Sequence, residues 1–547
     1  MLAVVQGAAG SRVHQRGSEP TPVQATAYGF GPCPAIDSSF LSFALRRNLV
    51  VQPASAFLFR KAGYQAIDRI CDHYYSLQNK AVVPSVQPGY LKPLIPSAPP
   101  ESGEDFQIIA DDYQRLIVPG LAYWQHPSFF AYFPIASTFE GILGDLYASS
   151  VANPVFTWAS GPACSELEAI VMDWAAKLLG LAPGFMHESG IGGGAIQSTA
   201  SESAMIAIVA ARASYQRNYP DTKLEDLVIY VTSQTHSLGI KAGMVLGLAV
   251  RVLDVHSDNN YSLRGDTLSS ALEQDASAGK KPFILIATVG TTSSGAIDNV
   301  REIKEVVKDH PYLRIHVDAA WAGVAFSCPE YREMGYLAEI NDVADSFCTN
   351  FHKWGLVNLE ASALWVKNRK YLTEALDVTP PYMRTKQGDN DRTLDLRNWH
   401  LALSRRFRSL KLWFVLRSFG VKGFQQHIRK SIGLNNLFVS LARQSDIIEI
   451  LVPPSLGLTV FRVKPPSQHR DNLESLNALN TAFFSRLSVR DDIYLTQTLL
   501  DGVVCIRLAV GAVQTEESHI RSAFGIVVKE ATLAIDEWKQ RPVQSAL

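Results

Sequence analysis

The sequence predicts an α/β protein built around a largely parallel sheet, and two patterns in the middle of the chain indicate it. Short β-branched runs, each ending in a polar or glycine-rich turn, recur at 227–231, 284–289, 313–317, 346–349 and 362–366. Helical segments such as 203–215 and 300–308 lie between several of these runs. This alternation of strand and helix is typical of a parallel sheet that helices cover on both faces.

Length and composition fit a large globular protein and exclude several other classes. The 547 residues correspond to roughly three or four folding units at ~100–200 residues each. With 47% apolar and 19% charged residues, the chain is not wholesale disordered. Lys plus Arg is 51 and Asp plus Glu is 52, a net charge of 51 − 52 = −1, so neither nucleic acid nor an anionic membrane is an expected partner.

The cysteines and the apolar runs indicate the compartment. The six cysteines stand alone, without a CxxC pair or a Cys/His cluster. A disulfide framework and a metal site are therefore not expected, and a reducing compartment, the cytoplasm, is favoured. No run of about 18 apolar residues occurs, so no transmembrane helix is predicted.

The two ends of the chain differ from its middle. Residues 1–52 read as an extension that is disordered, although Arg12 and Arg16 leave an organellar presequence open. Helical patterns begin at about residue 56 and at residue 106, on either side of a proline-rich connector. A long helix near 412–419, with β-branched runs at 458–463 and 503–509, predicts a smaller α+β domain. The predicted boundaries are 1–52 for the extension, 53–138 for an N-terminal helical arm, 139–410 for the large domain and 411–547 for the small domain.

A glycine-rich stretch at 190–195 precedes one of the predicted helices. Glycines let backbone N–H groups approach a phosphate, and Thr199 or Ser201 can cap a helix that begins near Glu202. The stretch matches neither the P-loop nor the dinucleotide-binding pattern. By itself it therefore fits a phosphate cradle or an ordinary loop.

Polar residues follow three of the predicted strands. Hydroxyl side chains occupy 291–294, Asp318 comes just after the strand 313–317, and Lys353 follows the strand 346–349 by four residues. A buried carboxylate needs a cation or a donor, whereas a buried lysine loses its charge and becomes a nucleophile for a carbonyl. An acid for a ring nitrogen, a phosphate cradle and a lysine nucleophile together indicate pyridoxal phosphate.

Five longer motifs connect these residues to a known family. They are HPSFFAYFP at 126–134, WASGPACSELE from Trp158, VDAAWAG around Asp318, NFHKW around Lys353 and SRRFRSLKLWFVLR from Ser404. From about residue 53 to the C-terminus the chain resembles the group II pyridoxal-phosphate decarboxylases and, among them, the aromatic-L-amino-acid decarboxylases. The resemblance implies fold type I: a large domain with a mostly parallel seven-stranded sheet, a small C-terminal α+β domain and an N-terminal helical arm.

The resemblance also implies a role for each residue that matches a motif. Lys353 would carry the cofactor as a Schiff base, and Asp318 would pair with the pyridinium nitrogen. His236 would stack on the ring and serve catalysis. The remaining expected cofactor contacts are the phosphate-binding residues and two further neighbours of the cofactor: Ala200, Ser201, Asn350, His352, Thr292 and Ala320.

Catalysis in the family uses a tyrosine on a mobile loop as proton donor, which here matches Tyr382 in the polar segment 379–391. Relatives that form aldehydes by oxidative deamination commonly have Phe there or alter the stacking histidine. Because this chain keeps Tyr382 and His236, the resemblance favours simple decarboxylation to an amine and CO2. An aromatic acetaldehyde synthase and a histidine decarboxylase remain the alternative activities.

The expected substrate is tyrosine, phenylalanine or dopa, with tryptophan left open. Ser404 stands where some indole-specific relatives have Gly, and it would reduce the pocket volume. The other expected substrate contacts, beside His236, are Phe133, Ile135, Pro154 and Phe156. Two of these depart from the family pattern: Ile135 replaces the usual Thr, and Pro154 replaces a smaller or aliphatic residue. Phe351 likewise replaces the Pro of the NPHK motif.

The resemblance implies a homodimer with its active site at the subunit interface. The N-terminal helices would wrap the partner, and the loop with Tyr382 would reach the neighbouring site. A catalytically silent homologue that serves as a binding protein is the rival from another class. It is disfavoured because Lys353, Asp318, His236 and Tyr382 are all present.

Overall fold

The computed structural model describes residues 53–384, 393–464 and 472–540. The chain divides into two compact units, of which one contains residues 1–70 and 99–108 and the other the remainder. In the described part of the first unit, helix α2 (Pro53–Ser76) and helix α3 (Phe106–Asp112) begin. Phe57, Phe59 and Tyr64 on α2 are exposed. Both predicted N-terminal helices are therefore present, and α3 continues into a π-helical turn at Tyr113–Ile117. The segment 1–52 and its predicted disorder lie outside the described residues.

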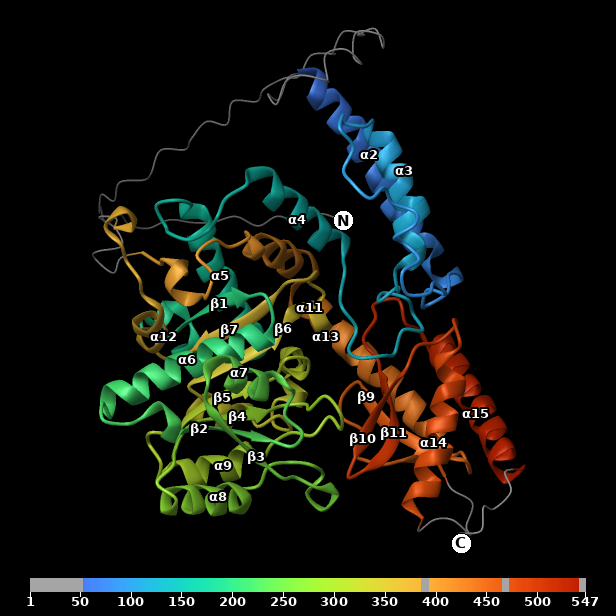
Figure 1. The fold of residues 1–547 in the computed structure, drawn as a ribbon. Helices are drawn as coiled ribbons and strands as arrows, with labels where there is room; N and C mark the ends of the chain where they lie inside the picture. The colour runs from blue at the N-terminus through green and yellow to red at the C-terminus, as the bar shows by residue number, and fades with distance from the viewer. Residues whose placement is uncertain (1–52, 385–392, 465–471, 541–547) are drawn as a thin grey trace, which may run out of the picture. The chain divides into compact units, whose positions relative to one another are not determined.

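The second unit contains the predicted sheet, a mostly parallel sheet of seven strands (Figure 1). Its strand order is β1-β7-β6-β5-β4-β2-β3, and β7 alone runs antiparallel to its neighbours. The strands are β1 (Gly193–Gln197), β2 (Leu227–Thr232), β3 (Ala249–Leu253), β4 (Lys281–Thr288), β5 (Arg314–Asp318), β6 (Ser346–Asn350) and β7 (Ser362–Val366). The five predicted strands are confirmed.

Strands β1 and β3 were not among the predicted strands. Glycine disfavours strands, so the glycine-rich stretch predicts a phosphate cradle or an ordinary loop and not a strand. Packing explains the strand: a Cβ on Gly194 would lie 2.5 Å from the Met172 side chain and 2.6 Å from Trp365. The glycines thus let β1 lie close against its neighbours. Edge strand β3 lacks the buried apolar run that marks the others, because Ala249 and Val252 are exposed.

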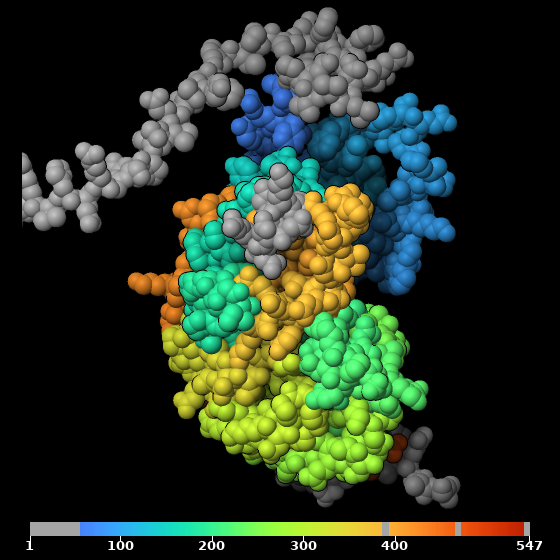
Figure 2. Space-filling view, turned by 90° about the vertical axis from the view of Figure 1, so that its left-hand side faces the viewer, coloured from blue at the N-terminus to red at the C-terminus, as the bar shows by residue number. Residues whose placement is uncertain are grey.

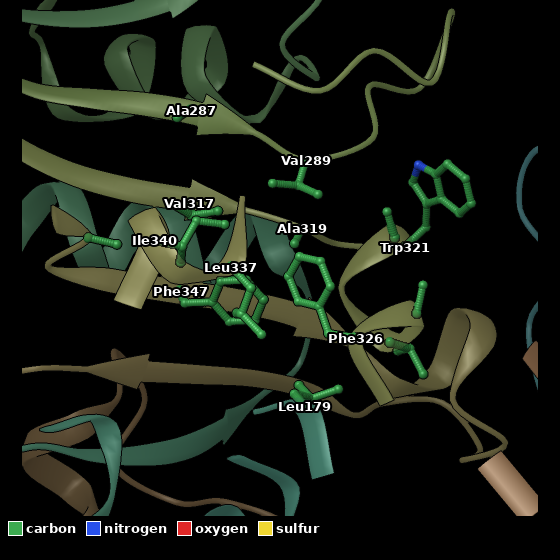
Figure 3. Packing of buried hydrophobic residues seen from close by; sticks show 14 of the residues in the cluster. Leu179, Ala287, Val289, Val317, Ala319, Trp321, Phe326, Leu337, Ile340 and Phe347 are labelled. Carbon is green, nitrogen blue, oxygen red and sulfur yellow. The ribbon is translucent and has the colours of Figure 1, made fainter. Parts of the chain in front are cut away.

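Both faces of the sheet are buried, which is why its strands read as continuous apolar runs. On β2, Val228 and Tyr230 join one buried cluster, whereas Leu227, Ile229 and Val231 join a second. The first cluster includes Val317 and Phe347 from the central strands (Figure 3). The helices of this domain are α4 (Phe139–Val151), α5 (Pro162–Leu179), α6 (Ala200–Asn218), α7 (Leu238–Leu246), α8 (Gly265–Ser277), α9 (Val300–Val307), α10 (Leu337–Val343), α11 (Phe351–Trp354) and α12 (Arg369–Leu376).

The C-terminal part is the predicted α+β arrangement. Helix α13 (Arg408–Arg443) is far longer than the expected 412–419, and its helical geometry breaks at Gly420, where φ is 58°. Beyond it lies a second sheet, ordered β10-β11-β9-β8, with its own buried cluster. Its elements are β8 (Ile448–Ile450), β9 (Leu458–Val463), α14 (Leu473–Ser488), β10 (Thr496–Leu500), β11 (Val503–Ala509) and α15 (Glu517–Gln540). Across the described residues, none of the helices is both long enough and apolar enough to cross a membrane.

Three buried histidines predict that acid destabilises the fold. The ordinary pKa of a histidine is 6.5. Mainly through burial, the pKa of His126 is lowered to about 4, and the pKa values of His316 and His352 are lowered to about 3. Each pKa is thus lower in the folded state than in the unfolded state. The free energy of unfolding is therefore at its full value above pH 6.5 and decreases as the pH falls toward 3–4. At pH 5 each histidine lowers the free energy of unfolding by about 2 kcal/mol.

We therefore expect the melting temperature to fall between pH 7 and pH 5, as calorimetry can measure. The variant His256→Gln is the control, because this exposed histidine pairs with Asp501 and its pKa is raised. Because a raised pKa stabilises the fold on acidification, removing this histidine should not lessen the fall. A melting temperature that is constant between pH 7 and pH 5 would contradict the prediction.

Candidate active site

A cavity of about 200 Å³ opens where the parallel strands end. It lies at the carboxyl ends of β2, β4, β5 and β6 and beside the N-terminus of α6, where ligands bind in open parallel sheets. Its lining residues are Thr199, Ala200, Ser201, His236, Leu238, Thr288, Gly290, Thr292, Asp318, Ala320, Trp321, Asn350, His352 and Lys353. The structure thus brings together all eight residues expected to bind the cofactor, together with His236.

The N-terminus of α6 provides one end of the cavity. Thr199 caps this helix: its Oγ1 accepts a hydrogen bond from the backbone N–H of Glu202 at 3.2 Å. Of the two predicted caps, Thr199 and Ser201, the structure uses Thr199, and the helix begins at Ala200, two residues before the expected start. The N–H groups of the first turn and the positive end of the helix dipole lie at Ala200 and Ser201, where a phosphate is favoured.

Asp318 and Lys353 supply buried charge at the ends of β5 and β6. Oδ1 of Asp318 accepts the N–H of Ala320 at 3.0 Å. Burial raises the pKa of this carboxyl group, and Lys353 opposes that rise. Burial likewise lowers the pKa of Lys353, with Asp318 acting in the opposite direction. The lysine is therefore easier to deprotonate to a nucleophilic amine than an exposed lysine would be.

Both histidines of the cavity are disposed to be neutral. Burial is the largest cause that lowers the pKa of His236, and its Nδ1 accepts the N–H of Leu238 at 3.3 Å. Nδ1 of His352 accepts the N–H of Ala361 at 2.9 Å, and burial lowers the pKa of His352 to about 3. Each ring therefore offers one N–H donor from Nε2.

Two buried oxygen atoms in the lining support the fit of a polar cofactor. Oδ1 of Asn350 and Oγ1 of Thr288 have no hydrogen-bond partner among the described residues. Buried polar atoms are normally paired, so such atoms in a cavity indicate a ligand or water. Together with the helix N-terminus, the buried carboxylate and the buried amine, they fit pyridoxal phosphate.

Besides His236, Phe133 is an expected substrate contact that lies close to Lys353. The lysine Nζ is 5.5 Å from the centroid of the Phe133 ring, which stacks on Trp321 at 4.6 Å. Trp321 is in turn held by a hydrogen bond from its Nε1 to the carbonyl of Gly290 at 2.7 Å. Ile135, two residues after Phe133, is half-buried.

The other expected substrate residues form a separate group outside the cavity lining. The N–H of Arg405, next to Ser404, donates to the carbonyl of Pro154 at 2.8 Å, and the N–H of Arg397 donates to that of Phe156 at 2.9 Å. Pro154 and Ser404 are exposed. On the face in Figure 2, the teal and the orange segments that carry them lie side by side.

Tyr382 also lies outside the cavity lining and is 81% exposed, on the short turn Pro381–Met383. Arg397 anchors the start of this segment. Its Nη1 donates to the carbonyl of Val378 and its Nη2 to Oγ1 of Thr379, each at 2.8 Å. The rest of the predicted loop, 385–391, lies outside the described residues.

Sequence reasoning missed Arg507 on β11. Its side chain is buried, and its guanidinium carbon lies 5.0 Å from the centroid of the same Phe133 ring that Lys353 approaches. Nη1 donates to Oγ1 of Thr496 at 3.1 Å and Nη2 to the carbonyl of Tyr132 at 3.2 Å. Nε has no partner among the described residues. The signal in the sequence was a lone arginine inside the apolar run 503–509, which needs a reason to be buried.

The fold and the cavity define a pyridoxal-phosphate enzyme of fold type I. Residues 88–464 match the family model described as the pyridoxal-dependent decarboxylase conserved domain. The chain belongs to this family, and pyridoxal phosphate is its cofactor.

Curated relatives match nearly the whole chain. A tyrosine decarboxylase 2 of Narcissus pseudonarcissus is 39% identical over 89% of this chain and 96% of its own length. An aromatic-L-amino-acid decarboxylase of Bos taurus is 40% identical over 85% and 94%. A phenylacetaldehyde synthase of Arabidopsis thaliana is 39% identical over 88% and 98%. Overall similarity therefore does not separate amine-forming from aldehyde-forming relatives.

Solved structures show the same fold. The crystal structure of Oryza sativa TDC with PLP and tryptamine has a TM-score of 0.85 and 34% sequence identity. The likeness covers 89% of this chain and 100% of that one. The fold predicted from the sequence is confirmed.

Proposed function

We propose that this pyridoxal-phosphate-dependent decarboxylase converts an aromatic L-amino acid to the corresponding amine and CO2. The observation that carries the proposal is the meeting of Lys353, Asp318 and His236 in one cavity, with the aromatic ring of Phe133 beside the lysine. The aromatic substrate class follows the relatives named above. Amine as the product follows from the presence of Tyr382 and His236.

Bound pyridoxal phosphate supplies a carbonyl that condenses with amines and a ring that accepts electrons from the substrate. In this chain Ala200, Ser201, Asn350 and His352 would hold its phosphate, while Thr292 and Ala320 would contact the cofactor. Asp318 would pair with the ring nitrogen and keep it protonated, and His236 would lie against the ring. Lys353 Nζ would hold the cofactor through its buried amine.

The remaining steps use other side chains. Phe133, which is buried beside Lys353, would exclude water from one side of the reacting carbon. After CO2 has left, Tyr382 Oη delivers a proton to Cα, and His236 supports that transfer. Protonation of Cα before it can react with dioxygen would keep the product an amine.

We further propose that two chains complete each site as a homodimer. Tyr382, Pro154 and Ser404 are exposed in the single chain and do not line its own cavity. Helix α4 also exposes apolar side chains: Phe139, Leu143, Leu146, Tyr147 and Val151. A contiguous exposed apolar face of this kind is typical of a protein interface. The division into an exchange arm, a large domain and a small domain, and the cytoplasmic location favoured by the isolated cysteines, stay predictions.

A substrate panel tests the proposed specificity. Tyrosine, phenylalanine, dopa, tryptophan and histidine would be supplied separately to the holoenzyme, and amine would be measured by mass spectrometry. We expect amine from the single-ring aromatic substrates at higher kcat/KM than from tryptophan. Amine from histidine alone would overturn the aromatic assignment in favour of a histidine decarboxylase.

Arg507 is proposed to attract the substrate carboxylate, because it is a buried cation with one unpartnered N–H near Lys353. Burial lowers its pKa to about 10, so it stays charged at neutral pH. We expect Arg507→Met to lower kcat/KM by about 10- to 100-fold, the loss of a hydrogen bond to a charged group worth about 1.5–3 kcal/mol. Steady-state kinetics with an aromatic amino acid measures this loss.

The matched control for Arg507→Met is Arg462→Met. Arg462 lies on β9, the neighbouring strand of the same sheet, and its Nε donates to Glu449 at 2.7 Å. It should change kcat/KM little. Equal losses in the two variants would show that Arg507 acts through the stability of the small domain and not on the substrate.

A further inference from the structure

A chain of four polar side chains runs beneath the cavity, between strands β5 and β6. In the parallel register His316 lies opposite Ser346, and Asp318 lies opposite Cys348. All four side chains are buried. Because residues two apart on a strand share a face, these cross-strand pairs lie on one face of the sheet. That face packs on α6, since Cys348 shares a buried cluster with Ala204 and Ala207 of that helix.

The contacts along this chain are continuous. Cys348 Sγ donates to Oδ1 of Asp318 at 3.8 Å. The same sulfur lies 3.6 Å from Nε2 of His316, whose Nδ1 is 2.8 Å from Oγ of Ser346. Asp318 is the one member of the chain that lines the cavity.

Counting protons fixes the direction of each bond. Burial, followed by the nearby Asp318, raises the pKa of the Cys348 thiol well above its ordinary value, so the thiol keeps its proton. That proton points to Asp318, so the sulfur can only accept from His316. Burial lowers the pKa of His316 to about 3, so its ring is neutral and carries one proton, on Nε2. Nδ1 then accepts the hydroxyl proton of Ser346.

We propose that Cys348, supported by His316 and Ser346, is a positioning residue that orients the Asp318 carboxylate and keeps it ionised toward the pyridine nitrogen of the cofactor. Every donor in the chain points toward Asp318. A hydrogen bond to a charged acceptor in a dry interior is stronger than one between neutral groups. The thiol therefore opposes the effect of burial, which by itself disfavours the ionised carboxylate.

Cys348→Ala removes the donor and tests the proposal without using activity as the readout. Fluorescence titration of the apoenzyme with pyridoxal phosphate gives the dissociation constant of the cofactor. We expect binding to weaken about tenfold, the effect of one lost hydrogen bond to a charged group. Cys348→Ser keeps an O–H donor and should bind the cofactor within about twofold of wild type.

Cys328→Ala is the matched control, because this cysteine is also fully buried and its thiol donates to a carbonyl, that of Gln425, at 3.7 Å. It should leave the dissociation constant unchanged. A void left by a truncated buried cysteine would affect Cys348→Ala and Cys328→Ala alike. The proposal would be overturned if Cys348→Ala bound the cofactor as tightly as wild type, or if Cys348→Ser failed to restore binding.

This inference rests on the proposed role of Asp318, and a double-mutant cycle separates the two. If the inference holds, Cys348→Ala has no further effect on cofactor binding in the Asp318→Asn background. Fully additive losses would overturn the inference and leave the role of Asp318 intact. Unchanged cofactor binding by Asp318→Asn alone would instead contradict the proposed function of the site.

Discussion

Lys353→Ala is expected to reduce amine formation below about one-thousandth of wild type, the size of effect that follows removal of a covalent catalytic group. The lysine is the only amine in the lining of the cavity that the structure describes, and burial lowers its pKa toward the nucleophilic form. Borohydride reduction of the wild-type holoenzyme should fix the cofactor on the peptide that contains Lys353. Mass spectrometry should find no such adduct in the variant.

Two control variants distinguish the loss of the nucleophilic amine from the loss of a positive charge and from the loss of a lysine elsewhere. Lys353→Arg keeps a cation but no nucleophilic amine, and it should be as inactive as the alanine variant. Lys367→Ala removes another lysine, on the loop after β7. Burial also lowers the pKa of Lys367, and its Nζ donates a hydrogen bond to the carbonyl of Asp342. It should stay active. Wild-type turnover by Lys353→Ala would refute the assignment.

Tyr382→Phe is expected to change the product. Without the phenol proton, amine formation should fall by about 10²–10⁴-fold, the usual contribution of a positioned general acid. The unprotonated substrate carbon then reacts with dioxygen, so CO2, ammonia, an aromatic aldehyde and hydrogen peroxide should appear. Oxygen uptake and aldehyde analysis measure the change. Tyr75→Phe, at an equal exposed fraction of 81%, is the control and should keep the amine as product.

Mixing Lys353→Ala with Tyr382→Phe, each of which should form little amine by itself, tests whether Tyr382 acts on the neighbouring subunit. In a heterodimer of the two variants, the Tyr382→Phe chain supplies an intact Lys353 and the Lys353→Ala chain supplies an intact Tyr382. If the tyrosine reaches across the interface, one of the two sites then has both residues. If the tyrosine acts across the interface, amine formation returns after the chains are mixed and allowed to exchange. No recovery in a demonstrated heterodimer would place Tyr382 in the site of its own chain.

The sequence allowed the sheet and the cofactor cavity to be predicted because both depend on local patterns. Apolar runs specify buried strands, and polar residues at strand ends meet at one edge of a parallel sheet, as Asp318 and Lys353 do. The strand β1 could not be predicted, because its glycines fit only through the long-range packing of Met172 and Trp365. Sequence patterns predict an element where the local spacing of apolar residues determines its structure. They do not predict an element that depends on packing against residues distant in the sequence.

Arg507 and Cys348 were missed for a related reason. Arg507 comes from the small domain, some 150 residues beyond Lys353 in the chain, and its approach to Phe133 depends on how β11 packs. Cys348 looks like an ordinary buried residue until the register of β5 and β6 places it opposite Asp318. The expected substrate contacts Pro154 and Ser404 were predicted through family resemblance, and the single chain leaves them outside the cavity lining.

The stoichiometry of the wild-type holoenzyme tests the central claim most directly. Supplied with tyrosine or phenylalanine in air, the enzyme should release CO2 and amine in equal amounts, with no oxygen uptake and no peroxide. Aldehyde and peroxide formed in step with CO2 would identify an aldehyde synthase and contradict the account. Failure to release CO2 from any aromatic amino acid would contradict the proposed substrate class.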